Sequence, residues 1–429
     1  MLLNELSAVE AARRLQSGEI TAEALTHACL DRIAAREPAV KAWVNFDPDY
    51  ALRQARALDK NTAPRGALYG LPIGIKDVFD TAELPTEMGS PIYKGHRPFS
   101  NAAPVASAQA AGAIILGKTV TAEFAGVHPG ETTNPLNPGH TPGGSSSGSA
   151  AAVADFMAPL AFGTQTGGSI LRPASFCGVV GYKPTYNTFS RTGLKLAAES
   201  FDTVGFLARD VDDAELLASA LLGQPFAPRT FDAPPRIGFC RTPVWKTAEP
   251  ATVEAVEDAA DRLAQTGARV SEVALDAGFS DLSEARDVIN SYERAQAMAD
   301  EWVRHRDLLS PRMAEGIAKG LATPRDTYAK ALAVTDRCRR RLAELSDTFD
   351  ALLAPCVPGE APAGIAWTGD TRFQAFWTML HVPTISLPTH SGPKGLPVGI
   401  QLVGKPQTDQ ALLAVARWCW RMLGSWKDR

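Results

Sequence analysis

Short apolar runs alternate with amphipathic segments along most of the chain, and this alternation predicts strands followed by helices. The runs typical of buried strands lie at 71–75, 113–116, 236–239, 351–355, 384–388 and 399–404. The helical segments lie at 1–60, 102–111, 251–265 and 283–345 and from Asp409 onward, with Thr21 a predicted N-cap for a helix at 22–36. We therefore expect an α/β fold, in which helices cover both faces of a mixed, twisted β-sheet.

No internal repeat and no low-complexity linker divides the chain, so we expect a single large domain spanning 1–429. Four sections are predicted within it. They are a helical N-terminal segment (1–60), a core that holds the candidate chemistry (66–230), an α/β section with a helical insert (235–350), and C-terminal strands with a final helix (351–429).

The composition of the chain indicates which kinds of partner are not expected, but it does not indicate a particular function. With 45% hydrophobic residues, 21% charged residues and a net charge of −4, the chain is typical of a protein that binds neither nucleic acid nor a membrane surface. No run of 18 apolar residues and no signal peptide is found, and the six cysteines are scattered without a CxxC pair. We therefore expect reduced thiols and a cytoplasmic location.

Two glycine-framed serine clusters carry the strongest chemical signal. They are GGSSSG at 143–148 and GGS at 167–169, joined by an Ala-rich segment and preceded by a long Gly/Pro-rich loop. A serine flanked by glycine amides is how a nucleophile obtains oxyanion donors from its own backbone. The alternative is two ordinary turns around a buried alanine helix. In either case we expect Ser146 and Ser147 to cap the helix that follows them.

Other motifs fit less well. Residues 112–119 match the phosphate-binding GxxxxGKT pattern, but the middle residues AIIL favour a strand rather than a loop. Ser146 matches the GxSxG nucleophile elbow, with His140 as a base, yet a proline-rich loop rather than a strand precedes it. Cys177 has no polarising histidine beside it, and the seven histidines show no metal-ligand spacing.

The segment 142–185, followed by Asp202-Thr203-Val204-Gly205, resembles the amidase signature family. The segments LPIGIKD at 71–77, GKT at 117–119 with Glu123-Phe124, and PVGIQLVG at 397–404 are similar to other family segments, in the same order. The resemblance covers most of the chain and is densest over 66–210. It implies an amide hydrolase of the amidase signature fold that needs no cofactor and no metal.

The resemblance also implies the site residues. Ser169 corresponds to the family's nucleophile, Ser145 to its bridging serine and Lys76 to its base, with a cis peptide expected between Gly144 and Ser145. The amides of four consecutive residues are the expected oxyanion hole, namely Thr166, Gly167, Gly168 and Ser169.

The chemistry of these residues agrees with that assignment. An ordinary lysine titrates near about 10.4 and is protonated at neutral pH, so Lys76 can act as a base only if burial lowers its pKa. A hydroxyl both donates and accepts, so Ser145 can pass a proton from Ser169 to Lys76 and back to the departing amine.

One position at which this sequence differs from the usual family pattern suggests the kind of substrate. Arg172 lies three residues after Ser169, where many members carry an arginine two residues after it. This resembles members that act on small carboxylated amides such as malonamate or a biuret-type compound, and the guanidinium fork could bind the carboxylate, with Gly144 beside it. An arginine paired with a structural acid is an equally good interpretation.

Other residues are further candidates for lining the pocket. They are the loop 125–141, with His128, Glu131, Thr132 and His140, and the aromatic residues Trp302, Trp367, Phe373 and Trp377.

Three other functions remain open. The chain could be the glutaminase (A) subunit of a Glu/Asp-tRNA amidotransferase, an aryl or aliphatic amide hydrolase without carboxylate recognition, or a non-enzymatic scaffold derived from an amidase. We expect a homodimer acting on a small-molecule amide, and a small accessory partner protein remains an alternative.

Overall fold

The computed structural model describes residues 2–231, 233–345 and 348–428, and within them one continuous 11-stranded sheet forms the centre of the molecule. The strands are β1 (Trp43–Phe46), β2 (Pro72–Lys76), β3 (Ile114–Thr119), β4 (Leu160–Gln165), β5 (Val180–Lys183), β6 (Thr203–Ala208), β7 (Arg236–Cys240), β8 (Arg269–Val273), β9 (Ala351–Pro355), β10 (Thr384–Ser391) and β11 (Pro397–Val403). The α-helices are α1 (Ala8–Ser17), α2 (Ala22–Val40), α3 (Pro48–Asp59), α4 (Ala103–Ala110), α5 (Ser147–Ala154), α6 (Leu171–Cys177), α7 (Val211–Leu221), α8 (Pro250–Gln265), α9 (Leu282–Ala297), α10 (Ala299–Arg304), α11 (Pro311–Leu321), α12 (Arg325–Leu345), α13 (Arg372–Met379) and α14 (Asp409–Leu423).

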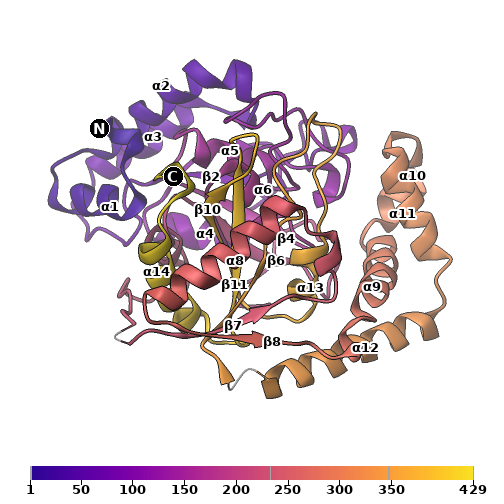
Figure 1. The fold of residues 1–429 in the computed structure, drawn as a ribbon. Coiled ribbons are helices and arrows are strands. Elements are labelled where there is room, and N and C mark those ends of the chain that lie inside the picture. The colour runs from indigo at the N-terminus through magenta and orange to yellow at the C-terminus, as the bar shows by residue number, and fades with distance from the viewer. Residues whose placement is uncertain (1, 232, 346–347, 429) are drawn as a thin grey trace.

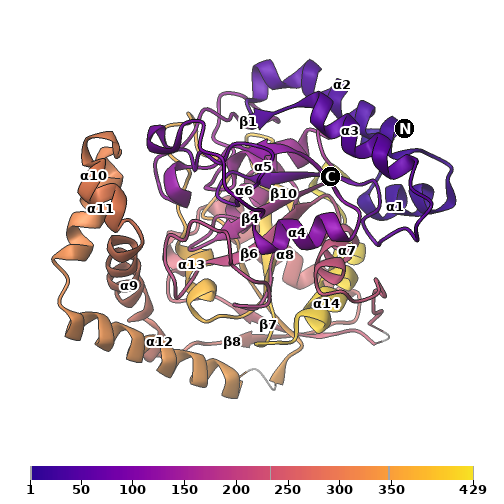
Figure 2. The same ribbon diagram turned by 180° about the vertical axis from the view of Figure 1, so that it is seen from behind.

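The sheet is mixed, as predicted. Its strand order is β1-β3-β2-β4-β6-β5-β10-β11-β9-β7-β8. The β2 strand runs parallel to both β3 and β4, and β7 runs parallel to both β8 and β9, whereas the other pairs are antiparallel. Helices α5, α6 and α8 pack on the face in front in Figure 1, and α4 and α7 pack on the face in front in Figure 2. The expected single α/β domain with helices on both faces is therefore confirmed.

The predicted elements are largely present, with two errors. Thr21 caps α2 as expected, because its hydroxyl accepts the Ala24 amide at 3.1 Å. The segment 1–60 is not wholly helical, since β1 interrupts it and pairs with β3 at the edge of the sheet. The predicted helical segment 283–345 is four helices. Pro311 begins α11 and Pro324 directly precedes α12, because proline lacks the N–H that a continuing helix needs, and α9 and α10 are separated at Met298.

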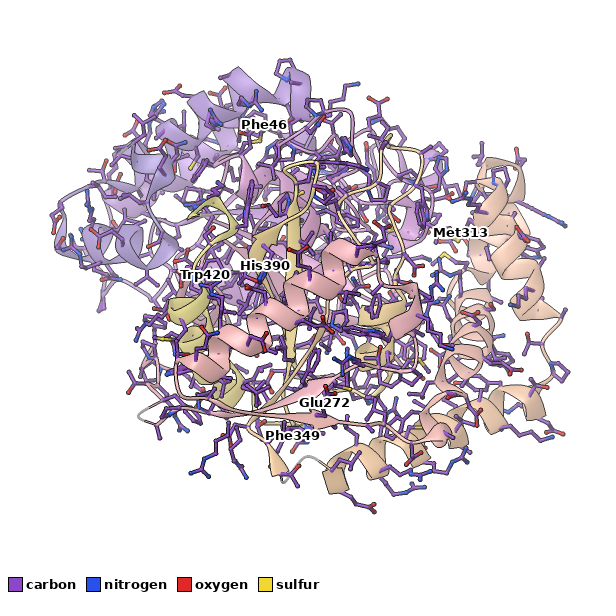
Figure 3. The ribbon with its side chains drawn as sticks, in the orientation of Figure 1. Phe46, Glu272, Met313, Phe349, His390 and Trp420 are labelled. Atoms are coloured by element: carbon purple, nitrogen blue, oxygen red, sulfur yellow. The ribbon has the colours of Figure 1, made fainter. Side chains whose placement is uncertain are left out.

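Helices α9 to α12 form a helical arm, residues 282–345, that stands to one side of the sheet in Figures 1 and 2. The arm meets the body through an apolar cluster in which Phe124 of the body packs with Met298 and Met313 of the arm. Figure 3 labels Met313 at this junction. The arm therefore has its own contact with the part of the body that follows β3.

Two composition-based predictions can be compared with the fold. All six cysteines are buried free thiols. None of the helices in the described ranges combines the length and the apolar character that crossing a membrane requires. The cytoplasmic location and the homodimer stay predictions.

Candidate active site

Lys76 ends β2, the strand held between β3 and β4, and its side chain is fully buried. Its Nζ lies 2.8 Å from the Ser145 hydroxyl and 2.7 Å from the Thr164 hydroxyl. Burial lowers the pKa of Lys76 to about 7, with a smaller opposing influence from the Asp202 carboxylate and a smaller lowering influence from Arg172. The amine can therefore be neutral near physiological pH while it contacts a serine hydroxyl.

Ser145 follows the loop that leads into α5, and the Gly144–Ser145 peptide is cis, as expected. The side chain is fully buried, and the Ser145 carbonyl accepts the Ala122 amide at 3.1 Å. Gly143 precedes it at φ +81°, and a Cβ there would lie 2.8 Å from the Pro173 Cα. The loop therefore needs glycine at 143 to pass close to α6.

Ser169 lies in the turn between β4 and α6, and it lines a cavity at the surface of this turn. Its backbone joins the first cluster, because the Ser146 amide donates to the Ser169 carbonyl at 3.2 Å. The Ser169 hydroxyl makes no hydrogen bond within the described ranges. The structure thus places Lys76 and Ser145 in direct contact and brings Ser169 beside them through the backbone.

The turn around Ser169 is held from several sides. Thr378 donates to the Gly167 carbonyl at 2.8 Å, and Gln165 Oε1 accepts the Ile170 and Leu171 amides at 3.0 and 3.1 Å. A Cβ on Gly168 would lie 2.5 Å from Gln374 Oε1, so only glycine fits there. In the described part of the chain the amides of Gly167, Gly168 and Ser169 donate to no acceptor, which leaves them free for an oxyanion.

Two supporting residues escaped the sequence reasoning. Thr164 is the second hydrogen-bond partner of Lys76, and Asp202 accepts the Thr166 hydroxyl together with the Ala198 amide at 3.1 Å. Asp202 is buried, and burial raises its pKa even though these donors oppose the rise. The sequence did mark Asp202, because it belongs to one of the segments that resemble the amidase signature family, but the sequence alone did not indicate what its carboxylate does.

The alternative motifs do not form the sites that their patterns suggest. Residues 114–119 are the strand β3, and Lys118 forms a fully buried ion pair with Asp77 at 2.9 Å rather than lining a phosphate loop. Ser146 is buried and donates to the Thr164 carbonyl at 3.3 Å, so it is neither an exposed nucleophile nor a side-chain cap of α5, contrary to the capping prediction. Ser147 donates to the Val120 carbonyl instead of capping the helix.

The cavity beside Ser169 has a volume of about 320 Å³. Its lining is Ala125, Gly126, Val127, Thr166, Gly167, Ser169, Arg172, Arg286, Asn290, Arg294, Trp367, Thr368, Gly369, Asp370 and Thr371. Of the four predicted aromatic residues, Trp367 is in this lining. Phe373 and Trp377 are buried in the core, and Trp302 packs against the apolar cluster between the arm and the body. The four polar residues predicted from the loop 125–141 are not in the lining. In the described ranges no group of His, Cys, Asp and Glu side chains could hold a metal ion.

Arg172 lies in the cavity wall but is already engaged. Its Nε donates to the Gly144 carbonyl at 3.1 Å, and its terminal nitrogens donate to the carbonyls of Gly144 and Gly369. Burial lowers the pKa of Arg172 to about 9, with Asp370 opposing the shift and Arg286 adding to it. Three of the five N–H groups of this guanidinium are therefore used on the backbone, and Gly144 itself is not in the lining.

A buried amine whose pKa is lowered to about 7, a serine hydroxyl in contact with it, and a second serine whose turn presents free amides are groups that together can activate a serine for attack on a carbonyl carbon. Comparison with known proteins agrees with this chemistry. The Amidase family model matches residues 24–413, and the chain belongs to the amidase family. It is therefore an amidohydrolase of the amidase signature type, and the scaffold alternative is not supported.

Individual relatives share nearly the whole length. The chain is 35% identical to the A subunit of the glutamyl-tRNA(Gln) amidotransferase of Roseiflexus castenholzii, over 96% of this chain and 95% of the relative. Among solved structures, one described as an amidase has a TM-score of 0.90 and 31% identity, covering 98% of this chain and all of the other. A chain from a vestigial protein complex connected with an s-triazine catabolic enzyme has a TM-score of 0.89 and 27% identity, over 98% and 99% of the two chains.

Proposed function

We propose that this protein hydrolyses the amide bond of a small carboxylated molecule through an acyl-enzyme on Ser169. The observation that carries the proposal is the contact between a fully buried Lys76 and Ser145 at 2.8 Å, beside the turn that holds Ser169. The substrate enters the cavity with its carbonyl carbon at the Ser169 hydroxyl.

In the first step the Ser169 oxygen attacks the carbonyl carbon, and its proton passes to the Ser145 oxygen as the Ser145 proton passes to Lys76. The carbonyl oxygen becomes an oxyanion and is bound by the amides of the turn, from Thr166 to Ser169. Lys76 now carries the positive charge, and the adjacent Thr164 hydroxyl at 2.7 Å accepts a hydrogen bond from it.

In the second step the oxyanion collapses and the C–N bond breaks. The proton on Lys76 returns through Ser145 to the departing nitrogen, so ammonia or an amine leaves and Lys76 is neutral again. Water then attacks the acyl carbon and loses a proton through Ser145 to Lys76. As the ester C–O bond breaks, that proton returns through Ser145 to the Ser169 oxygen, and the product acid leaves and ionises to the carboxylate.

Ammonia release is the test. The wild-type protein is given malonamate, biuret, glutamine and simple aliphatic and aryl amides, without any partner protein. The proposal expects turnover of a carboxylated small amide by the chain alone, and loss of that turnover in Ser169→Ala. Equal turnover by Ser169→Ala, or turnover of neutral aryl amides only, contradicts it.

The glutaminase component of a tRNA amidotransferase is the second candidate, because the chain is 35% identical to such a protein over nearly its whole length. Glutamine carries an ammonium group as well as a carboxylate, and that ammonium group needs a carboxylate of the protein. Asp370 is the one acidic residue in the cavity lining of the described structure, and its Oδ2 already accepts Arg372 Nε at 2.7 Å. A cavity with this charge favours a substrate that is an anion rather than a zwitterion. Glutamine turnover that depends on added partner proteins would favour the second candidate.

A further inference from the structure

One face of α9 projects three polar side chains into the catalytic cavity. Arg286, Asn290 and Arg294 are four residues apart, a spacing that places them on the same side of a helix, and all three are in the cavity lining. The helical arm therefore supplies two guanidinium groups to the space in front of Ser169.

Within the described ranges, Arg294 is a buried cation without an anionic partner in contact. It is 8% exposed, and its hydrogen-bond partners in the described structure are the Asn290 amide oxygen at 3.4 Å and the Met313 sulfur at 3.6 Å. Burial lowers its pKa, the Asp202 carboxylate opposes that shift, and smaller influences come from Arg286, which lowers the pKa, and Glu123, which raises it. A buried charge without a counter-ion destabilises a protein, so this arrangement is unfavourable unless an anion binds beside it.

Arg286 extends the positive charge toward the nucleophile turn. A Cβ placed on Gly167 would lie 3.2 Å from Arg286 NH2, so the guanidinium lies against the turn that carries Ser169. Its acidic partner is Asp287 at 3.2 Å, which is exposed on the outer side. The cavity lining thus contains three arginines against the single carboxylate of Asp370, which is itself paired with Arg372.

The arm that carries these arginines is fixed to the body. Glu293 of α9 accepts the Ser200 amide of the body at 2.8 Å. At the start of α11, the Ser310 amide donates to Glu123 at 3.1 Å. Because these contacts hold α9 in place, binding an anion between its arginines requires little reordering.

We infer that Arg294 and Asn290, with Arg286 beside them, form the subsite for the substrate's carboxylate. The inference rests on the proposed function and names the residues that select the substrate. The ligand is a monoamide of a short dicarboxylic acid, whose amide carbon lies at Ser169 and whose carboxylate accepts N–H groups of Arg294. Arg172 is not the principal partner, because the backbone carbonyls of Gly144 and Gly369 occupy most of its donors.

The kinetic test compares two substrates that differ only in charge. Malonamate and malonamide, or succinamate and succinamide, exchange a carboxylate for a neutral amide of the same shape. In the wild type we expect kcat/KM to favour the carboxylated member. In Arg294→Met this preference should fall by about 10- to 100-fold through KM, as expected when a charge-assisted hydrogen bond is lost. Arg294→Lys keeps the charge without the fork and should recover part of the preference.

A second experiment measures binding of a dicarboxylate to the proposed subsite and does not depend on hydrolysis of any substrate. Titration of malonate into the protein, followed by calorimetry, should show a Kd that rises by about 10- to 100-fold in Arg294→Met. The same variant should have a higher Tm than the wild type in the absence of ligand, because a methionine packs with Met313 and the unpaired charge is gone. Malonate should raise the Tm of the wild type only.

The matched control is Arg304→Gln, an exposed arginine of the arm that pairs with Asp300 at 3.0 Å outside the cavity. It should leave both the substrate preference and malonate binding at wild-type values. An unchanged preference and an unchanged Kd in Arg294→Met would overturn the inference. If the wild type hydrolyses no amide, the proposed function fails, and malonate binding alone then decides whether this subsite exists.

Discussion

The serine clusters and the helical arm face the same cavity, and they are built in different ways. Around Ser145 and Ser169 small residues let backbone segments approach so closely that Gly143 and Gly168 have no room for a Cβ. On the arm, the guanidinium groups of two long side chains from α9, Arg286 and Arg294, line the cavity. The reacting groups are thus fixed by the backbone, whereas the proposed recognition groups lie at the ends of adaptable side chains. Chemistry and substrate selection should therefore be separable by mutation.

Substitution of the reacting groups should have the largest effect on kcat. Ser169→Ala removes the nucleophile and Lys76→Ala removes the base, so each should lower kcat by about 10⁴- to 10⁶-fold. The double variant should be little worse than either single variant, because residues that act as a unit are not additive. Ammonia release under saturating substrate measures all three.

The matched control for these variants is Ser147→Ala, which removes a nearby serine whose hydroxyl, in the described part of the chain, bonds only the Val120 carbonyl, at 3.3 Å. It should retain kcat within a few-fold of the wild type. A Lys76→Ala variant with near-normal kcat would show that another group takes the proton, and the triad would have to be abandoned.

The next largest effect is expected from substitutions that disturb the tightly packed turn that carries Ser169. In Gly168→Ala the new Cβ meets Gln374 Oε1 at 2.5 Å, and Gln374 is fully buried and bonded to the Cys356 carbonyl. The turn must shift, and a displacement of about 1 Å can cost about 100-fold in kcat. In Gly167→Ala the nearest atom is the flexible end of Arg286 at 3.2 Å, so the loss should be smaller. Equal losses in both would mean that packing at 168 does not position Ser169.

The pH dependence of kcat/KM tests the state of Lys76. The amine accepts a proton only when neutral, and burial lowers its pKa to about 7. Protonation increases as the pH falls, so kcat/KM should drop about tenfold per pH unit below 7 and level off above it. Because the Asp202 charge raises this pKa, Asp202→Asn should move the acid limb to lower pH. A flat profile between pH 5 and 9 argues against lysine as the base.

The sequence predicts the region around the serine clusters better than it predicts the helical arm. The strand that carries Lys76 follows from a local apolar run, and the serine clusters and the cis peptide at Ser145 follow from the family-like segments. The arm does not, because an Arg-x₃-Asn-x₃-Arg face on an amphipathic helix is typical of a solvated surface. Only the tertiary position of α9 turns that face toward the cavity. For Arg172 the spacing left two roles open, a fork for the substrate and a structural pairing, and only the fold shows that its donors reach backbone carbonyls.

The smallest expected effect concerns the attachment of the arm. Glu301 of α10 is fully buried, and a single oxygen, Oε1, accepts both the Tyr93 hydroxyl at 2.6 Å and the Lys195 ammonium. Glu301→Gln keeps an oxygen that can accept both donors and loses only the charge, whereas Glu301→Ala loses both bonds. We expect KM for the carboxylated amide to rise by about two- to fivefold in Glu301→Gln, with kcat unchanged, and to rise further in Glu301→Ala. If instead kcat falls while KM is constant, the arm also positions the reacting groups, and the separation of chemistry from recognition does not hold.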